Sequence, residues 1–125
     1  MRIIGGKYKG RRIEPPPGFK ARPTTDFARE SLFNILVNRI DFEESMVLDL
    51  FAGTGSISYE FSSRGAKEVH LVEQNPKHIS GIKRIIRDFG FENIRTIHID
   101  VRTYLKVCKV KYDIVFADPP YDLRG

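Results

Sequence analysis

The chain has 125 residues, of which 41% are hydrophobic and 30% are charged, and a chain of this length forms one domain around one core. No apolar run approaches the roughly 18 residues that cross a bilayer, so we expect no membrane role. The start, MRIIGGKYKG, lacks the apolar segment of a secretory signal, which predicts a cytoplasmic protein. The single cysteine, Cys108, excludes an internal disulfide and a zinc site of several thiolates.

The net charge of +5 is concentrated in the first 25 residues, which contain seven basic residues and one acidic residue and so have a net charge of +6. The other hundred residues therefore sum to −1. Such a segment suits an arm that holds a polyanion, although a basic face that only aids solubility would show the same charge.

The arm begins with RIIGGKYKGRRI, which alternates β-prone residues with glycine and predicts a small basic β-ribbon. Pro15 to Pro17 cannot donate to a strand ladder and predict an extended linker. The next segment, RPTTDFARESLFNILVNRI, predicts a helix of about four turns that Thr24 or Thr25 caps. Its predicted apolar face comprises Ala28, Leu32, Ile35 and Leu36.

From Met46 onward, four short apolar runs alternate with helical segments, the pattern of a parallel α/β sheet with right-handed crossovers. The runs are MVLDLFAG, KEVHLVE, IRTIHID and YDIVFAD. Between the second and third runs, Asn75 caps a helix that Gly90 ends. Its predicted buried stripe is Ile79, Ile82, Ile86 and Phe89. We expect the strand order 3-2-1-4, which places the first and fourth strands side by side.

The loop LDLFAGTGSIS carries Gly53 and Gly55 where the first strand becomes a helix. A dinucleotide-binding loop has a third glycine, and Ser58 stands in its place. Glu73, twenty residues after Gly53 at the end of the second strand, can accept hydrogen bonds from both hydroxyls of a ribose. These residues predict a cofactor that contains a nucleoside.

Asp49 lies inside the first strand, just before the loop. A carboxylate there repels a pyrophosphate but can hold the ammonium of an amino acid, which favours S-adenosylmethionine. Asp100, after the third strand, is placed either to contact the adenine amine or to cap the next helix, and both interpretations remain open.

The tetrapeptide DPPY, from Asp118 to Tyr121, follows the fourth strand. The Asp118 carboxylate and Pro119 carbonyl can accept hydrogen bonds from an exocyclic amine of a base, freeing its lone pair to attack a methyl group. Pro120 keeps that carbonyl rigid, and Tyr121 can stack on the base. A plain turn is the alternative. The three histidines are dispersed, so we expect no metal.

These segments together resemble the RsmD family of bacterial 16S rRNA guanine-N2 methyltransferases, a class I S-adenosylmethionine-dependent group. The resemblance implies a Rossmann-like sheet and a cytoplasmic enzyme that methylates a guanine in the assembling small ribosomal subunit. It implies Asp118, Pro119, Pro120 and Tyr121 as catalytic residues, and Asp49, Phe51, Gly53, Gly55, Glu73 and Asp100 as cofactor-binding residues. It also implies RNA contacts at Lys7, Lys9, Arg11, Arg12 and Arg22, with the cofactor carboxylate as an alternative partner for Arg22.

On this basis we expect residues 1–24 to form an RNA-binding arm and residues 25–125 to form a methyltransferase domain that binds S-adenosylmethionine. Members of the family continue with further strands, so we expect a truncated sheet, with strand four as an edge that a second copy can cover. A DNA adenine-N6 methyltransferase also uses DPPY. A fragment that binds cofactor or RNA without catalysis is the third alternative.

Overall fold

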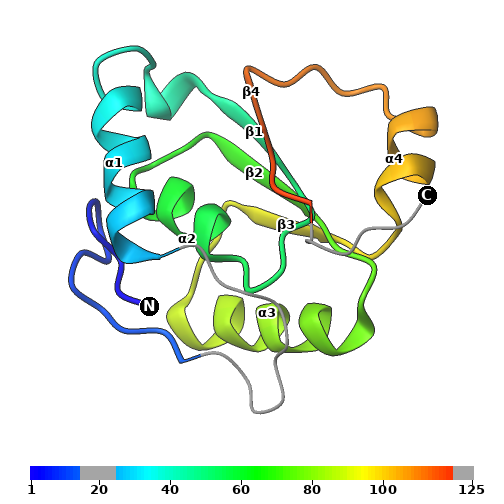
Figure 1. Ribbon diagram of the computed structural model, residues 1–125, viewed down its shortest axis with the longest axis horizontal. Helices are drawn as coiled ribbons and strands as arrows, with labels where there is room; N and C mark the ends of the chain where they lie inside the picture. The colour runs from blue at the N-terminus through cyan, green and yellow to red at the C-terminus, as the bar shows by residue number, and fades with distance from the viewer. Residues whose placement is uncertain (15–24, 120–125) are drawn as a thin grey trace.

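The structure, a computed structural model, describes residues 1–14 and 25–119. Its centre is a sheet of four parallel strands in the order β3-β2-β1-β4, as the sequence predicts (Figure 1). The strands are β1 (Met46–Leu50), β2 (Glu68–Val72), β3 (Ile94–Ile97) and β4 (Ile114–Ala117).

The register brings the carboxyl ends of the central strands to one edge. Asp49 of β1 pairs with Leu71 of β2 and with Phe116 of β4, and Leu50 pairs with Ala117. The loops that follow these strands therefore start side by side, which is where open α/β sheets bind ligands.

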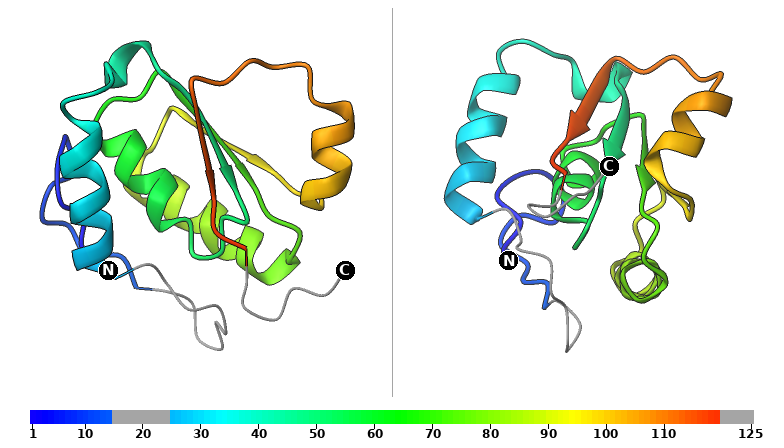
Figure 2. Two further views of the ribbon diagram at one scale, coloured as in Figure 1. Left: turned by 45° about the horizontal axis from the view of Figure 1, so that its top comes forward. Right: turned by 45° about the vertical axis from the view of Figure 1, so that its right-hand side comes forward.

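Helices cover both faces of this sheet (Figure 2). They are α1 (Asp26–Leu36), α2 (Ser56–Ser63), α3 (Pro76–Phe89) and α4 (Val101–Val107), with a short 3-10 turn, η1 (Phe42–Glu44). The first three helices pack on the face that presents Val47 and Leu71, and α4 packs on the face that presents Leu48 and Val72. Within the described ranges, no helix is long and apolar enough to span a bilayer.

The predicted bounds of α3 are confirmed, whereas Ile86 and Phe89 of its predicted buried stripe are only partly buried. The Asn75 side chain accepts hydrogen bonds from the backbone N–H groups of Lys77 and His78, and Gly90 ends the helix with φ 73°. Ile79 and Ile82 are buried.

The prediction for α1 is partly wrong. Thr25 is the cap, but the helix has 11 residues, about three turns, and buries Arg29 and Phe33. Ile35, placed on the predicted apolar face, is 57% exposed, and Ala28 is also exposed. The reason is that the neighbouring α2 offers a buried carboxylate, so the side of α1 that packs inward carries an arginine.

The predicted ribbon is present as a hairpin within residues 1–14, with one antiparallel bridge between Arg2 and Arg12. Its apolar residues are core residues: Ile3 is 0% exposed, Ile13 is 3% exposed, and both belong to the cluster that contains Tyr59 of α2. The predicted proline linker lies outside the described residues. The hairpin is therefore packed into the body of the protein.

Candidate active site

The loop between β1 and α2 turns through three residues with positive φ: Phe51 at 56°, Gly53 at 59° and Gly55 at 84°. Two observations favour glycine at position 55. Its φ is positive, and a Cβ atom there would lie 2.7 Å from the hydroxyl of Tyr59. Phe51 is the non-glycine residue of the described chain with positive φ, a costly conformation that is concentrated at functional sites.

Glu73 follows β2 and holds this loop. One carboxylate oxygen accepts the Gly53 N–H at 2.8 Å, and the other accepts the Asn75 N–H at 2.9 Å. Glu73 is 8% exposed. A carboxylate offers about four acceptor positions, so Glu73 retains capacity to accept hydrogen bonds from a ligand's hydroxyl groups.

Asp49 is 2% exposed, and its Oδ2 accepts a 2.7 Å hydrogen bond from the Ser58 hydroxyl. Burial raises the pKa of Asp49 to about 7; the charges of Glu73 and Asp118 also raise it, while the hydrogen bonds from Ser58 lower it. None of the cationic side chains in the described chain forms an ion pair with it. Asp49 is thus a buried carboxyl group that has no cationic partner among residues 1–14 and 25–119.

Asp118 follows β4 directly. Because Leu50 pairs with Ala117, Asp118 is level with Phe51 at the start of the glycine loop. It is exposed, and its charge acts on Asp49. Pro119 is also exposed, whereas Pro120 and Tyr121 lie outside the described residues. The structure therefore gathers three predicted acids, Asp49, Glu73 and Asp118, at one edge.

Asp100 caps α4, one of the two roles that the sequence left open. Its oxygens accept hydrogen bonds from the Thr103 N–H at 3.0 Å and the Thr103 hydroxyl at 2.6 Å. These bonds hold the pKa of Asp100 below its usual value. The position after β3 is on the same edge as the glycine loop, and its contact with adenine stays a prediction.

The predicted RNA contacts Lys7, Lys9, Arg11 and Arg12 are exposed on the hairpin, and Arg22 lies outside the described residues. The hairpin tip is on the other side of the molecule from the three acids. The Lys7 N–H donates to the Ser63 carbonyl at 2.7 Å, and the Tyr8 hydroxyl to the Gly90 carbonyl at 3.4 Å. Ser63 and Gly90 end α2 and α3, which run from the carboxyl edge back to the amino edge.

Sequence reasoning missed two side chains near the loop. The first is Ser58, which donates a hydrogen bond to Asp49. The sequence could have indicated it, because a small hydroxyl residue stands where a dinucleotide-binding loop has its third glycine. The second is Tyr59, which no sequence pattern indicates. It is fully buried beneath Gly55, and its hydroxyl has no hydrogen-bond partner among residues 1–14 and 25–119. Its burial raises its pKa, so the hydroxyl remains a neutral donor.

Solved structures share this architecture. A hypothetical protein of Thermus thermophilus is 32% identical with a TM-score of 0.88, over 98% of this chain and 71% of that one. A precorrin-6y C5,15-methyltransferase of Geobacter metallireducens has a TM-score of 0.66 at 19% identity, over 82% of this chain and 51% of that one. Together with the strand order, these similarities show a Rossmann-like methyltransferase fold.

Related sequences fix the family. Ribosomal RNA small subunit methyltransferase D of Buchnera aphidicola (subsp. Baizongia pistaciae) is 36% identical over 121 residues, which are 97% of this chain and 61% of that protein. The chain thus spans about three fifths of the length of such curated relatives. A family model described as Conserved hypothetical protein 95 matches residues 1–125. The chain therefore belongs to this family, the RsmD family.

Proposed function

We propose that this protein transfers a methyl group from S-adenosylmethionine to an exocyclic base amine in small-subunit ribosomal RNA. The observation that carries the proposal is the buried Asp49, which has no ion pair within the described residues, beside Glu73 and Asp118 at the glycine loop. The name of the related methyltransferase D supports ribosomal RNA as the substrate. The resemblance to the RsmD family makes N2 of a guanine in 16S rRNA the acceptor that we propose.

The charge of the site favours this cofactor. S-adenosylmethionine supplies a methyl group on a sulfonium and also carries an ammonium, so it is attracted to an acidic edge that would repel a pyrophosphate. Asp49 holds the ammonium, and the free acceptor positions of Glu73 take the ribose hydroxyls. Asp100 and Phe51 are the proposed neighbours of the adenosine.

Asp118 acts on the acceptor base. Its carboxylate and the Pro119 carbonyl accept hydrogen bonds from the base amine, which keeps the nitrogen lone pair out of the ring and directs it at the methyl carbon. S-adenosylmethionine would supply the methyl group to this nitrogen and leave as the neutral thioether S-adenosylhomocysteine, and the methylated amine would release its proton to solvent. Pro120 and Tyr121 complete this loop in our proposal, with Tyr121 stacked on the base. A ribosomal RNA substrate places the enzyme in the cytoplasm.

The test is transfer of labelled methyl groups from S-adenosylmethionine to small ribosomal subunits that lack the modification. We expect Asp118→Ala to lower the rate by about 10²-fold or more without changing cofactor affinity. Asp88→Ala is the matched control, because Asp88 is exposed on α3. Undiminished transfer by the Asp118 variant overturns the catalytic assignment.

The proposed role of the hairpin in RNA binding is tested by removing its charges and measuring how RNA affinity depends on salt. If about four of its cations contact phosphates, the log–log salt slope of RNA affinity is near −3, from roughly −0.7 per contact. Replacing Lys7, Lys9, Arg11 and Arg12 with glutamine should flatten this slope. Substitution is preferable to deletion, because Ile3 and Ile13 of the hairpin are core residues.

A further inference from the structure

We propose that Glu60 fixes the hairpin of residues 1–14 in one orientation, so that its cations form a preorganised RNA-binding surface. Glu60 and its partner Arg29 are then positioning residues that touch neither RNA nor cofactor. The inference rests on the proposed function for its RNA partner, but the fixed hairpin itself can be tested without RNA.

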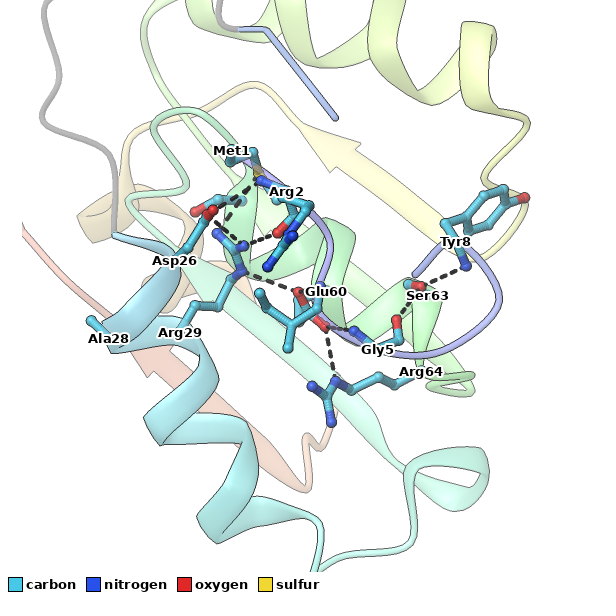
Figure 3. Close-up of polar contacts among 12 residues, drawn as sticks. Met1, Arg2, Gly5, Tyr8, Asp26, Ala28, Arg29, Glu60, Ser63 and Arg64 are labelled. Atoms are coloured by element: carbon cyan, nitrogen blue, oxygen red, sulfur yellow. Dashed lines mark hydrogen bonds and ion pairs between the residues drawn. The ribbon is translucent and has the colours of Figure 1, made fainter. Parts of the chain in front are cut away.

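Glu60 lies in the middle of α2, and its carboxylate is saturated with donors (Figure 3). Oε1 accepts the Ile4 N–H at 3.0 Å and the Arg29 Nε–H at 3.1 Å. Oε2 accepts the Gly5 N–H and the Arg64 Nε–H, both at 2.9 Å. Two of these four donors are backbone groups of the hairpin, so one side chain of α2 binds the hairpin directly.

Arg29 extends the same attachment to α1. Its side chain, like that of Glu60, is 0% exposed. Its Nη2 donates to the Arg2 carbonyl and, at 2.8 Å, to Asp26 Oδ1, which also accepts the Arg2 N–H at 3.2 Å (Figure 3). Both polar groups of the Arg2 backbone are therefore bound to α1.

Ser63, the last residue of α2, holds the tip. Its hydroxyl donates to the Gly5 carbonyl at 2.6 Å and accepts the Tyr8 N–H at 3.0 Å, while its carbonyl accepts the Lys7 N–H at 2.7 Å. A Cβ atom at Gly6 would lie 2.0 Å from that carbonyl, so the contact is close along the whole turn.

These contacts bind the inner side of the hairpin and leave its cations outside. The backbone of residues 2, 4, 5, 7 and 8 is attached to α1 or α2, whereas Lys7, Lys9, Arg11 and Arg12 are exposed. Every residue of α2 is buried, so this helix is a rigid support. The hairpin is attached to the second half of α2, at Glu60 and Ser63, and the Arg11 guanidinium also lies 4.3 Å from the centroid of the Phe89 ring of α3.

Fixing this surface has a consequence for RNA binding. A flexible arm must lose conformational freedom when it binds a phosphate chain, whereas a docked arm has already lost it during folding. Because α2 begins directly after the glycine loop, the attachment also fixes the cations relative to the site that holds Asp49.

The first test needs no ligand: hydrogen exchange of the Ile4 and Gly5 amides in the full chain. The glutamine side chain of Glu60→Gln has one acceptor oxygen, which cannot accept hydrogen bonds from all four donors. We therefore expect the backbone amides of Ile4 and Gly5 to exchange about tenfold faster or more. The Leu71 amide of the central sheet reports whether the core remains folded. Glu30→Gln is the matched control, since Glu30 is exposed on α1. Unchanged exchange at Ile4 and Gly5 overturns the proposal.

The second test measures affinity for a 16S ribosomal RNA transcript as a function of salt. Glu60→Gln should bind about tenfold more weakly with an unchanged salt slope, because the cations remain but are no longer ordered. Affinity for S-adenosylmethionine should not change. Loss of both affinities would indicate global damage and overturn the positioning role. If the wild-type chain binds no RNA, the proposed function fails while the exchange result still stands.

Ser63→Ala supplies a milder variant should Glu60→Gln fail to fold. It removes the hydroxyl bonds to Gly5 and Tyr8 but leaves the buried ion pair intact. We expect faster exchange of the Tyr8 amide and a fewfold loss of RNA affinity, again without a change in salt slope. Wild-type values for both quantities would overturn the proposal.

Discussion

Asp49 of β1 and Glu60 of α2 are both buried carboxylates, at 2% and 0% exposure, yet their surroundings are opposite. Glu60 has four donors, including the guanidinium groups of Arg29 and Arg64. Asp49 has the Ser58 hydroxyl and two acids as neighbours, and its pKa rises to about 7. A carboxylate that the fold has already paired is a structural group. One that the fold has buried without a cation is a candidate for binding a ligand.

The contrast also separates the two proposed partners of the protein. The acids Asp49, Glu73 and Asp118 collect at the carboxyl edge, which suits a cationic cofactor. The exposed cations collect on the hairpin, which suits a polyanion. Helix α2 connects the two regions. Its Ser58 donates a hydrogen bond to Asp49 at the carboxyl edge, and its Glu60 accepts hydrogen bonds from the hairpin.

The largest expected effect comes from breaking the paired carboxylate. Glu60→Ala leaves Arg29 buried with only part of its hydrogen bonding, and removing one partner of a buried ion pair costs about 3–5 kcal/mol. We expect the free energy of unfolding in urea to fall by this amount. Exposed Glu30→Ala should change it by less than about 0.5 kcal/mol. Equal effects of the two substitutions would contradict the structural role of Glu60.

The sequence predicted the regular part of this arrangement. The four strands, their order and α3 follow from apolar runs and caps such as Asn75, which are local signals. The placement of Asp49, Gly53 and Glu73 together follows from the rule that parallel strands share a carboxyl edge.

What the sequence did not predict is which polar residues are buried. Arg29 and Glu60 lie 31 positions apart, and neither could be assigned to the interior without its partner. The apolar Ile35 was assigned to the interior and is exposed, because the packing of α1 is decided by the Arg29 pair and Phe33. Buried charge depends on tertiary contacts, so periodicity alone does not reveal it.

The second expected effect is the pH dependence that Asp49 gives to stability. Its folded pKa of about 7 is above the unfolded value of about 3.9, so the folded state retains a proton that the unfolded state has lost. The contribution of Asp49 to the free energy of unfolding is therefore greatest below pH 4. It falls by up to about 1.4 kcal/mol per pH unit as the pH rises to 7. Urea unfolding of the wild type and of Asp49→Asn should therefore diverge over this range.

The direction of that divergence is the decisive point. As the pH rises, the free energy of unfolding of Asp49→Asn should increase relative to that of the wild type. The exposed variant Asp88→Asn should show the same pH dependence as the wild type. Parallel curves for all three proteins would mean that Asp49 is not the strained carboxyl group that its burial indicates.

The third expected effect is on the cofactor. An ammonium is attracted to Asp49 only when the carboxyl group is ionised, so affinity for S-adenosylmethionine should rise by up to tenfold per pH unit until about pH 7. It should fall again above about pH 8, where the α-amino group of the free cofactor loses its proton. Asp49→Asn should bind weakly at every pH. Calorimetric titrations between pH 5.5 and about 8.5 measure both. A flat wild-type profile would leave Asp49 without a role in binding the ammonium.

The smallest expected effect concerns Ser58, whose hydroxyl bond to Asp49 stabilises the ionised form. Removing a hydrogen bond to a charged group costs about 1.5–3 kcal/mol, so Ser58→Ala should move the midpoint of the cofactor pH profile upward by about one pH unit or more. Exposed Ser80→Ala is the control on α3. Because the substitution adds no charge and leaves Glu73 in place, a displacement of the rising part of the profile to higher pH identifies Ser58 as the group that keeps Asp49 ionisable. A lower affinity at every pH, with the midpoint unmoved, would instead mean that Ser58 supports the loop and not the carboxylate.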